Sequence, residues 1–349
     1  MAAHIQTKSS VLSARLMAAH IQTMQNILVI SNCRLGDALV MIPALRCLKA
    51  LPARITLASE AAAPGIVAAE DILGDRGLVD CFVKMSTSGG FFDRLLDRLR
   101  FFTRMRREKW DLGIVLMPPC PPLTMRLVKR LCTYLRLCGC RKIIAPQGIQ
   151  TNMQVADMML DMLSQNNIAP IADGSLPKLA KSTPNLLPNG KKYIVVAPGA
   201  NMPVNCWALD NYATVLKTIT AKYNCTPVYF SGENERTLCE RLYEKVPGHT
   251  IIGRPLPEVE SAMRQCQAYL GNDTGLIHLA AALGLPCIGI YSNRNPRGIW
   301  EPYTPQKLIF YPEDCDCAGC LKTQCDKMCI NQTTPQKVLS TIDESTFLQ

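Results

Sequence analysis

The sequence has 349 residues, of which 48% are hydrophobic and 19% charged, and its formal net charge is +10. This length and apolar content suit two ordinary domains, each with its own core, and exclude long disordered regions. No uninterrupted apolar run approaches the roughly 20 residues that a spanning helix needs, so we expect no transmembrane segment.

The first 24 residues are expected to form a poorly ordered leader. The heptapeptide MAAHIQT occurs at 1–7 and again at 17–23, and two copies are too few for a stacked repeat architecture. No compact apolar run precedes a small-residue cleavage site, so a secretory signal is not predicted. An organelle transit peptide is an alternative, because residues 1–36 contain no acid. We therefore expect a cytoplasmic protein.

Short apolar segments alternate with amphipathic ones through the first half of the chain. The apolar segments predict strands at 26–30, 55–58, 79–83, 112–117 and 143–145. Helical spacing predicts helices at 38–50, 91–109 and 123–137. Pro43 lies inside the first of these helices, which is therefore kinked or begins there. The alternation indicates a doubly wound, Rossmann-like acceptor domain over 25–172.

A segment rich in Pro, Asn, Ser and Gly predicts a linker over 173–192, after which the alternation resumes. Strands are predicted at 193–197, 227–230, 250–252, 268–271 and 287–291. Helices are predicted at 209–222, 235–245, 258–265 and 274–283. Residues 193–349 are therefore a second doubly wound, Rossmann-like domain of an α/β protein, ending in a cysteine-rich segment. Ligands of such sheets bind at the carboxyl ends of the strands.

The strand predicted at 268–271 runs into a helix that begins near Asp273, Thr274 and Gly275. Free N–H groups in the first turn of a helix, together with its dipole, favour a bound phosphate, and glycine lets a ligand approach the backbone. His278 follows Thr274 by one turn, on the same helix face. The alternative is that Asp273 and Thr274 only cap a buried helix and that His278 is a core residue.

Two further junctions between strand and loop carry candidate site residues. Gly36 and Asp37 begin a helix after the first strand, where a carboxylate can take a proton from an acceptor hydroxyl. Pro198 and Gly199 follow the first strand of the second domain and bring backbone N–H groups near the expected cleft. A helix cap is the alternative role for Asp37.

In this order and at these separations, the three segments resemble glycosyltransferase family 9, the ADP-heptose:lipopolysaccharide heptosyltransferases. The resemblance covers most of the chain and implies a GT-B architecture, in which two Rossmann-like domains face each other across a central cleft. It implies inversion at the sugar's anomeric centre without a metal. Asp37 matches the family's proposed general base. The implied donor-binding residues are Gly36, Pro198, Gly199, Asn205, Asp273, Thr274, Gly275, Leu276 and His278.

One position departs from the pattern of the family. The family commonly has a lysine two residues before a tryptophan in the Pro-Gly loop, where it contacts the donor phosphates. This sequence has Asn205 at that place, before Cys206 and Trp207. An amide lacks the positive charge that favours a diphosphate leaving group. Arg294 or Arg297, in the loop after the last predicted strand, are candidates to supply it.

The positive charge is concentrated in the first half of the chain. Residues 91–142 hold thirteen basic residues against four acidic ones, on two amphipathic helices. This pattern fits peripheral contact with the anionic inner membrane face, or a groove for an acidic glycolipid. A solvated basic face is the alternative. No nucleic-acid-binding motif accompanies the charge, so we expect no nucleic-acid partner.

Seventeen cysteines divide into two groups. Twelve are scattered, such as Cys33, Cys47, Cys225 and Cys287, and are expected to be free thiols buried in a reducing compartment. The other five lie between residues 315 and 329. The last four have a spacing that can surround one structural zinc or iron ion, with disulfides or free thiols as alternatives. They are Cys317, Cys320, Cys325 and Cys329.

The sequence therefore predicts an inverting glycosyltransferase that needs no cofactor for catalysis. It would move a heptose or related sugar from an ADP-sugar or other nucleotide-sugar donor onto a lipopolysaccharide core or similar acidic glycolipid. The alternatives are a nucleotide-sugar epimerase and a non-catalytic binding protein that keeps the GT-B fold. Asp37 and Thr274 are expected to face each other across one cleft.

Overall fold

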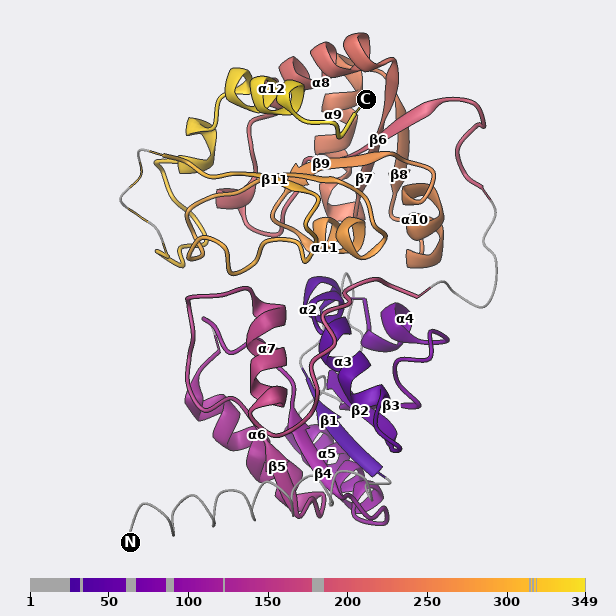
Figure 1. Cartoon of the computed structure of the whole chain (residues 1–349), viewed down its shortest axis with the longest axis vertical. Coiled ribbons are helices and arrows are strands. Elements are labelled where there is room, and N and C mark those ends of the chain that lie inside the picture. The colour runs from indigo at the N-terminus through magenta and orange to yellow at the C-terminus, as the bar shows by residue number, and fades with distance from the viewer. Residues whose placement is uncertain are drawn as a thin grey trace, which may run out of the picture. The chain divides into compact units, whose positions relative to one another are not determined.

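The computed structural model describes residues 26–31, 34–60, 67–85, 91–121, 123–177, 185–313, 315, 317 and 319–348. The chain divides into two compact units, Met1–Asp173 and Gly174–Gln349, each built around a parallel sheet (Figure 1). Each unit is described by itself below. The leader predicted over 1–24 lies outside the described residues, and the linker over 173–192 stays a prediction.

The first unit holds a five-stranded sheet in the order β3-β2-β1-β4-β5, with every pair parallel. Its strands are β1 (Asn26–Ile30), β2 (Arg54–Glu60), β3 (Cys81–Met85), β4 (Leu112–Val115) and β5 (Lys142–Ile144). β1 lies at the centre of the sheet. Four of its five residues are apolar and buried, as expected for a parallel strand covered on both faces.

The helices of the first unit are α2 (Leu35–Val40), α3 (Ile42–Lys49), α4 (Ala69–Leu73), α5 (Phe91–Met105), α6 (Met125–Leu137) and α7 (Val155–Ser164). The helix predicted at 38–50 is thus two helices that meet at Met41. Pro43 lies in the first turn of α3, where its missing N–H costs nothing because first-turn N–H groups have no partner inside the helix. α3 and α7 pack side by side (Figure 1).

The two basic helices pack against each other. The rings of Phe102 in α5 and Tyr134 in α6 meet edge to face, with centroids 5.5 Å apart. α5 ends at Met105 rather than at Lys109, and the indole N–H of Trp110 donates to the Met105 carbonyl oxygen at 2.7 Å. Among the described residues, no helix is both long enough and apolar enough to cross a lipid bilayer.

The second unit holds a six-stranded parallel sheet in the order β11-β10-β9-β6-β7-β8. Its strands are β6 (Lys192–Ala197), β7 (Cys225–Ser231), β8 (His249–Ile252), β9 (Ala268–Asn272), β10 (Cys287–Ile290) and β11 (Lys307–Phe310). Its α-helices are α8 (Leu209–Tyr223), α9 (Arg236–Lys245), α10 (Leu256–Met263), α11 (Gly275–Ala282) and α12 (Pro335–Glu344). Three short 3₁₀ helices are η1 (Pro203–Asn205), η2 (Glu233–Glu235) and η3 (Cys329–Gln332).

In each sheet, the direction in which the chain adds successive strands reverses near the middle of the sheet. In the first unit the chain adds β2 and β3 on one side of β1 and then β4 and β5 on the other. In the second unit the reversal falls between β6 and β9. Ligands of open parallel sheets bind at such reversals, beyond the carboxyl ends of the strands. The strands at these reversals include β1, β6 and β9, and the segments that follow them carry Asp37, Pro198 and Asp273.

Among the described α-helices and strands, four have no counterpart in the ranges predicted from the sequence: α4, α7, β11 and α12. α7 is buried at seven of its ten positions, and its polar residues are confined to one narrow stripe of Asp157, Asp161 and Ser164. β11 has only four residues, and three of them are partly exposed. The other predicted elements are present, with ends shifted as is usual for such boundaries.

Candidate functional site

Asn272 joins the loops that leave β6 and β9. Its side chain is fully buried, and its Oδ1 accepts hydrogen bonds from the Trp207 backbone N–H at 3.3 Å and the Tyr212 hydroxyl at 2.8 Å. Its Nδ2 donates to the carbonyl oxygens of Pro198 at 2.8 Å and Gly199 at 3.4 Å. These bonds hold the Pro-Gly loop beside the start of α11. The sequence analysis did not identify this role of Asn272. The pattern that indicates it is a polar amide at the end of an otherwise apolar strand.

Thr274 caps α11, as its Oγ1 accepts a hydrogen bond from the Leu276 N–H at 3.3 Å. Asp273 precedes the cap and is partly buried. Burial raises the pKa of the Asp273 carboxyl to about 7, against the opposing effects of the Asn295 amide and the Arg294 charge. Asn295 Nδ2 donates to Asp273 Oδ2 at 3.4 Å. The start of α11 thus combines a capped helix end with a carboxyl that gains and loses a proton near neutral pH.

His278 lies on α11 one turn beyond Thr274, and it is buried. Burial lowers the pKa of the imidazole to about 4, so the ring is neutral at pH 7. Its Nδ1 has no hydrogen-bond partner among the described residues, and the ring packs edge to face against Trp300 at 6.3 Å. A neutral imidazole here can exchange hydrogen bonds with a ligand but cannot neutralise a phosphate.

Glu235 is a residue of this region that sequence reasoning missed. A Cβ placed on Gly199 would lie 2.6 Å from the Glu235 carboxyl carbon, so the glycine lets the carboxylate rest against the Pro-Gly loop. Burial raises the pKa of Glu235, and a backbone hydrogen bond at Gly232 opposes this. A carboxylate in this position can accept hydrogen bonds from the hydroxyl groups of a ligand.

Asn205, at the end of η1, is buried, and its side chain is hydrogen-bonded to another residue of the second unit. Its Oδ1 accepts a hydrogen bond of 2.6 Å from the Ser292 hydroxyl, beyond β10. The structure therefore connects this position, predicted as donor-binding, to the loop that carries Arg294 and Arg297.

Asp37 and Gly36 lie in the first unit, in the first turn of α2. Asp37 Oδ2 accepts a hydrogen bond from the Arg34 backbone N–H at 3.3 Å, so the carboxylate does cap its helix. Burial raises the pKa of Asp37 to about 6, although this hydrogen bond and the Arg34 charge lower it. A carboxyl with this pKa is mostly ionised at pH 7 and basic enough to accept a proton. That Asp37 and Thr274 share a cleft stays a prediction.

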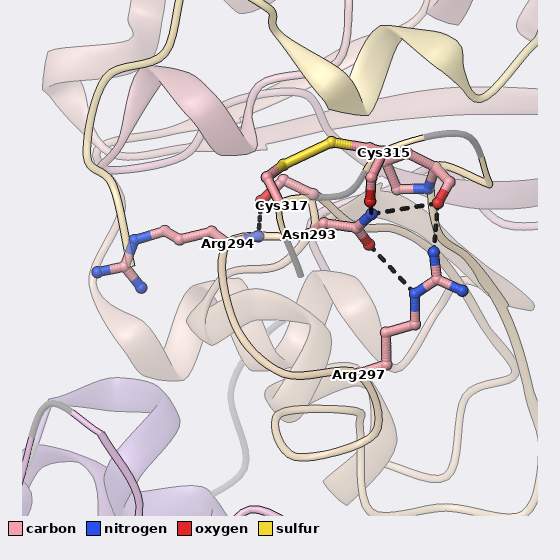
Figure 2. The surroundings of a disulfide bond; sticks show 7 residues. Asn293, Arg294, Arg297, Cys315 and Cys317 are labelled. Carbon is pink, nitrogen blue, oxygen red and sulfur yellow. Dashed lines mark hydrogen bonds between the residues drawn. A yellow bond between two sulfur atoms is a disulfide. The ribbon is translucent and has the colours of Figure 1, made fainter. Parts of the chain in front are cut away.

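The cysteine-rich segment brings together a group that differs from the predicted four. The sulfur atoms of Cys315, Cys317 and Cys329 lie within 4.8 Å of one another, and Cys315 and Cys317 form a disulfide (Figure 2). Cys320 and Cys325 are partly exposed free thiols outside this group.

The scattered cysteines that the structure describes are free thiols, and most are buried as expected, but Cys81, Cys132 and Cys206 are only partly buried. Cys47, Cys225 and Cys287 are free and buried, and burial raises the pKa of each thiol. Cys33 lies outside the described residues.

Comparison with known proteins connects this arrangement to one family. The model of glycosyltransferase family 9 (heptosyltransferase) matches residues 139–331, more than half of the chain. A lipooligosaccharide heptosyltransferase 2 of Campylobacter jejuni is 24% identical over 183 residues, which are 49% of this chain and 57% of that relative. The chain thus matches little more than half the length of this curated relative.

Two solved structures share the fold over nearly the whole chain. A family 9 glycosyl transferase of Veillonella parvula has a TM-score of 0.73 and 16% identity, covering 93% of this chain and 97% of its own. The ADP-heptose LPS heptosyltransferase II of Escherichia coli has a TM-score of 0.70 and 17% identity, covering 93% and 98%. The predicted two-domain GT-B fold and the family resemblance are confirmed. The chain belongs to glycosyltransferase family 9, a family of glycosyltransferase enzymes.

Proposed function

We propose that this protein transfers a heptose or related sugar from a nucleotide-sugar donor, with ADP-heptose as first choice, to an acidic glycolipid of the lipopolysaccharide-core type. The observation that carries the proposal is the junction in the second unit, where Asn272 holds the Pro-Gly loop against the start of α11. A capped helix start favours a diphosphate, and the nearby Glu235 carboxylate suits a ligand rich in hydroxyls. Family membership and the names of the relatives support the sugar and the acceptor class.

In the proposed reaction Asp37 accepts the proton of an acceptor hydroxyl. The acceptor oxygen then forms a bond to the anomeric carbon, and the bond from that carbon to the donor diphosphate breaks. Attack opposite the leaving group inverts the anomeric centre, and the nucleoside diphosphate departs with the electron pair. The pKa of about 6 for Asp37 supports its assignment as the base.

A donor panel tests this proposal directly. ADP-, UDP- and GDP-sugars are compared by thermal shift, because a ligand at 100 times its Kd stabilises the folded protein by about 2.7 kcal/mol. The proposal expects one nucleotide class to stabilise the protein, and release of the nucleoside diphosphate only when an acidic glycolipid is added. Sugar turnover without any acceptor would instead identify an epimerase. The absence of both stabilisation and turnover would identify a binding protein without this activity.

Membrane contact is the second part of the proposal. We define the basic surface as the exposed basic residues of the described parts of α5 and α6, which are Arg98, Arg100, Arg104, Arg126, Lys129, Arg130 and Arg136. Leu96, Leu99 and Leu137 on the same helices are 51%, 54% and 44% exposed. Exposed leucines beside arginines suit the interface of an anionic bilayer, where each basic residue contributes about 1 kcal/mol. This surface would keep the enzyme beside a lipid-anchored acceptor.

Replacing Arg98, Arg100 and Arg104 together by Gln is expected to weaken binding to anionic vesicles about 100-fold, because three such charges contribute about 3 kcal/mol. The measurement is co-sedimentation with phosphatidylethanolamine vesicles that contain or lack phosphatidylglycerol. The matched control replaces Lys191, Lys217 and Arg241, three exposed basic residues of the second unit, by Gln. Equal vesicle binding by wild type and the α5 variant would show that the basic surface is merely solvated.

A structural metal ion in the reduced cysteine-rich segment is the third part. Three sulfur atoms within 4.8 Å provide the donor type that zinc and iron favour, and reduction of the disulfide frees two of them as thiolates. Cys320 and Cys325 are the further thiols of the segment. The ion would hold the segment and take no part in sugar transfer.

Protein purified under reducing conditions is expected to contain about one zinc or iron ion per chain, measured by plasma mass spectrometry, since four thiolates suffice for one tetrahedral ion. Cys329→Ser should remove most of this metal, because Cys329 contributes one of the three clustered sulfur atoms. Cys225→Ser is the control, as Cys225 is a buried thiol of the core. Equal metal content in the two variants would contradict the assignment.

A further inference from the structure

The loop after β10 carries two arginines, Arg294 and Arg297. The side chain of Arg297 contacts three other residues of the protein. Its Nε donates to Asn293 Oδ1 at 3.2 Å, and one of its terminal nitrogens donates to the Pro312 carbonyl oxygen. Its guanidinium also lies 5.4 Å from the centre of the Tyr311 ring. Figure 2 shows this side chain directed toward the chain that leads to Cys315. Arg297 is exposed, but two of its donors are bound to protein oxygens, so this side chain fixes the loop.

Arg294 points away from Arg297 and from the disulfide (Figure 2). Its Nη1 donates to Asn295 Oδ1 at 2.9 Å, while its Nε is buried and has no partner within the described part of the chain. An unpaired buried donor on a charged group is costly. A bound anion would remove that cost.

Asn295 connects this guanidinium to the start of α11. The same amide group that accepts from Arg294 donates to Asp273 Oδ2 at 3.4 Å. The Arg294 charge also lowers the pKa of Asp273. Two independent features that favour an anion therefore lie together, the arginine and the positive end of a helix capped by Thr274.

The backbone of Arg294 is held from both sides, so the position of its side chain is built into the fold. Its N–H donates to the Ser292 hydroxyl oxygen at 3.3 Å, and that hydroxyl donates to Asn205 Oδ1 at 2.6 Å. Its carbonyl oxygen accepts from the Leu321 N–H at 3.0 Å, which belongs to the cysteine-rich segment. Asn205 thus anchors the loop that presents the arginine instead of carrying a charge itself.

We propose that Arg294 binds the diphosphate of the nucleotide-sugar donor, with Asn205 and Ser292 as the residues that position it. This inference rests on the proposed function, because it names the cation of the same donor site. The guanidinium would neutralise the charge of the departing nucleoside diphosphate, and its planar fork can contact two phosphate oxygens at once.

The test compares ADP, UDP and GDP with adenosine, uridine and guanosine, by calorimetry on the full chain. Arg294→Gln should weaken binding of the preferred nucleoside diphosphate by about 10- to 100-fold, the range for a lost hydrogen bond to a charged group, and leave the nucleoside unchanged. Arg294→Lys keeps the charge and should stay within about tenfold of wild type. Arg254→Gln is the control, because Arg254 is an exposed arginine that forms an ion pair with Glu258.

The outcomes separate this inference from the proposed function. If wild type binds none of the nucleoside diphosphates, both fail. If wild type binds one and Arg294→Gln binds it equally well, only the role of Arg294 is overturned, and an equal loss for diphosphate and nucleoside overturns it as well. If Arg294→Gln does not fold, Arg294→Lys decides the matter. A folded lysine variant with weaker diphosphate binding and unchanged nucleoside binding supports the inference, because lysine lacks the planar fork, and one that binds both as tightly as wild type overturns it.

Discussion

Asp37→Asn should lower the rate of sugar transfer by about 100- to 10,000-fold, the usual contribution of a general base. The amide keeps the size of the side chain and an oxygen that can still accept the Arg34 N–H, but it cannot take a proton from the acceptor. Donor affinity should remain within a few-fold of wild type. Steady-state rates at saturating donor and acceptor, together with thermal shift on donor binding, measure the two effects separately.

The same assignment predicts the pH dependence of the rate. With a pKa of about 6, Asp37 is ionised in roughly nine molecules of ten at pH 7 and in one of ten at pH 5, so kcat should fall about tenfold over that interval. The stability contribution of Asp37 has the opposite sign. Because its pKa is raised above the unfolded value of 3.8, its contribution to the free energy of unfolding is largest below pH 4 and decreases up to about pH 6. Its titration therefore cannot explain a lower rate at pH 5 by unfolding.

Asp71 provides a matched control for the capping role of Asp37. Its Oδ2 accepts a hydrogen bond of 3.3 Å from the Ala68 N–H at the start of α4, which repeats the contact between Asp37 and Arg34. Asp71→Asn should leave transfer unchanged, because Asp71 is exposed and carries no proposed chemistry. Near-parental transfer by Asp37→Asn, or equal losses in both variants, would show that Asp37 is only a cap.

The positions of the strands along the chain, and of the loops that leave them, follow from local patterns in the sequence. Apolar runs such as Asn26–Ile30 and Ala268–Asn272 are central parallel strands buried on both faces, so their composition alone marks them. Elements without such contrast were harder to predict. α7 has only a narrow polar stripe of three residues, and β11 is short and partly exposed.

The site residues also fall into two groups, those that a local sequence pattern identifies and those that only contacts in the folded chain identify. Thr274 and Asp37 stand at helix starts, where chain position alone indicates a cap or a ligand contact. Glu235 was missed because its contact with Gly199 joins segments far apart in the chain. The choice between Arg294 and Arg297 likewise depends on side-chain partners that no local pattern contains.

Asn272→Ala should destabilise the protein by about 3 to 6 kcal/mol, because a buried group left without its partner costs about 1–3 kcal/mol and this change affects several. The variant leaves the Trp207 N–H, the Tyr212 hydroxyl and the Pro198 carbonyl oxygen without the bonds they now make to Asn272. The whole free energy of unfolding of a domain is about 5–15 kcal/mol, so the loss is a large share. Urea unfolding of the full chain, followed by far-UV circular dichroism, measures it.

Two further variants, Tyr212→Phe and Asn234→Ala, test whether the loss of stability follows the number of hydrogen bonds removed. The tyrosine change removes one of the bonds to Asn272 and should cost about 1 kcal/mol. Asn234 is exposed, and its replacement should stay within about 0.5 kcal/mol of wild type. Donor affinity should fall with stability only in Asn272→Ala, since that variant alone frees the Pro-Gly loop from β9. A cost below about 1 kcal/mol for Asn272→Ala would contradict its role in joining the loops that leave β6 and β9, because three broken buried hydrogen bonds should cost more than that.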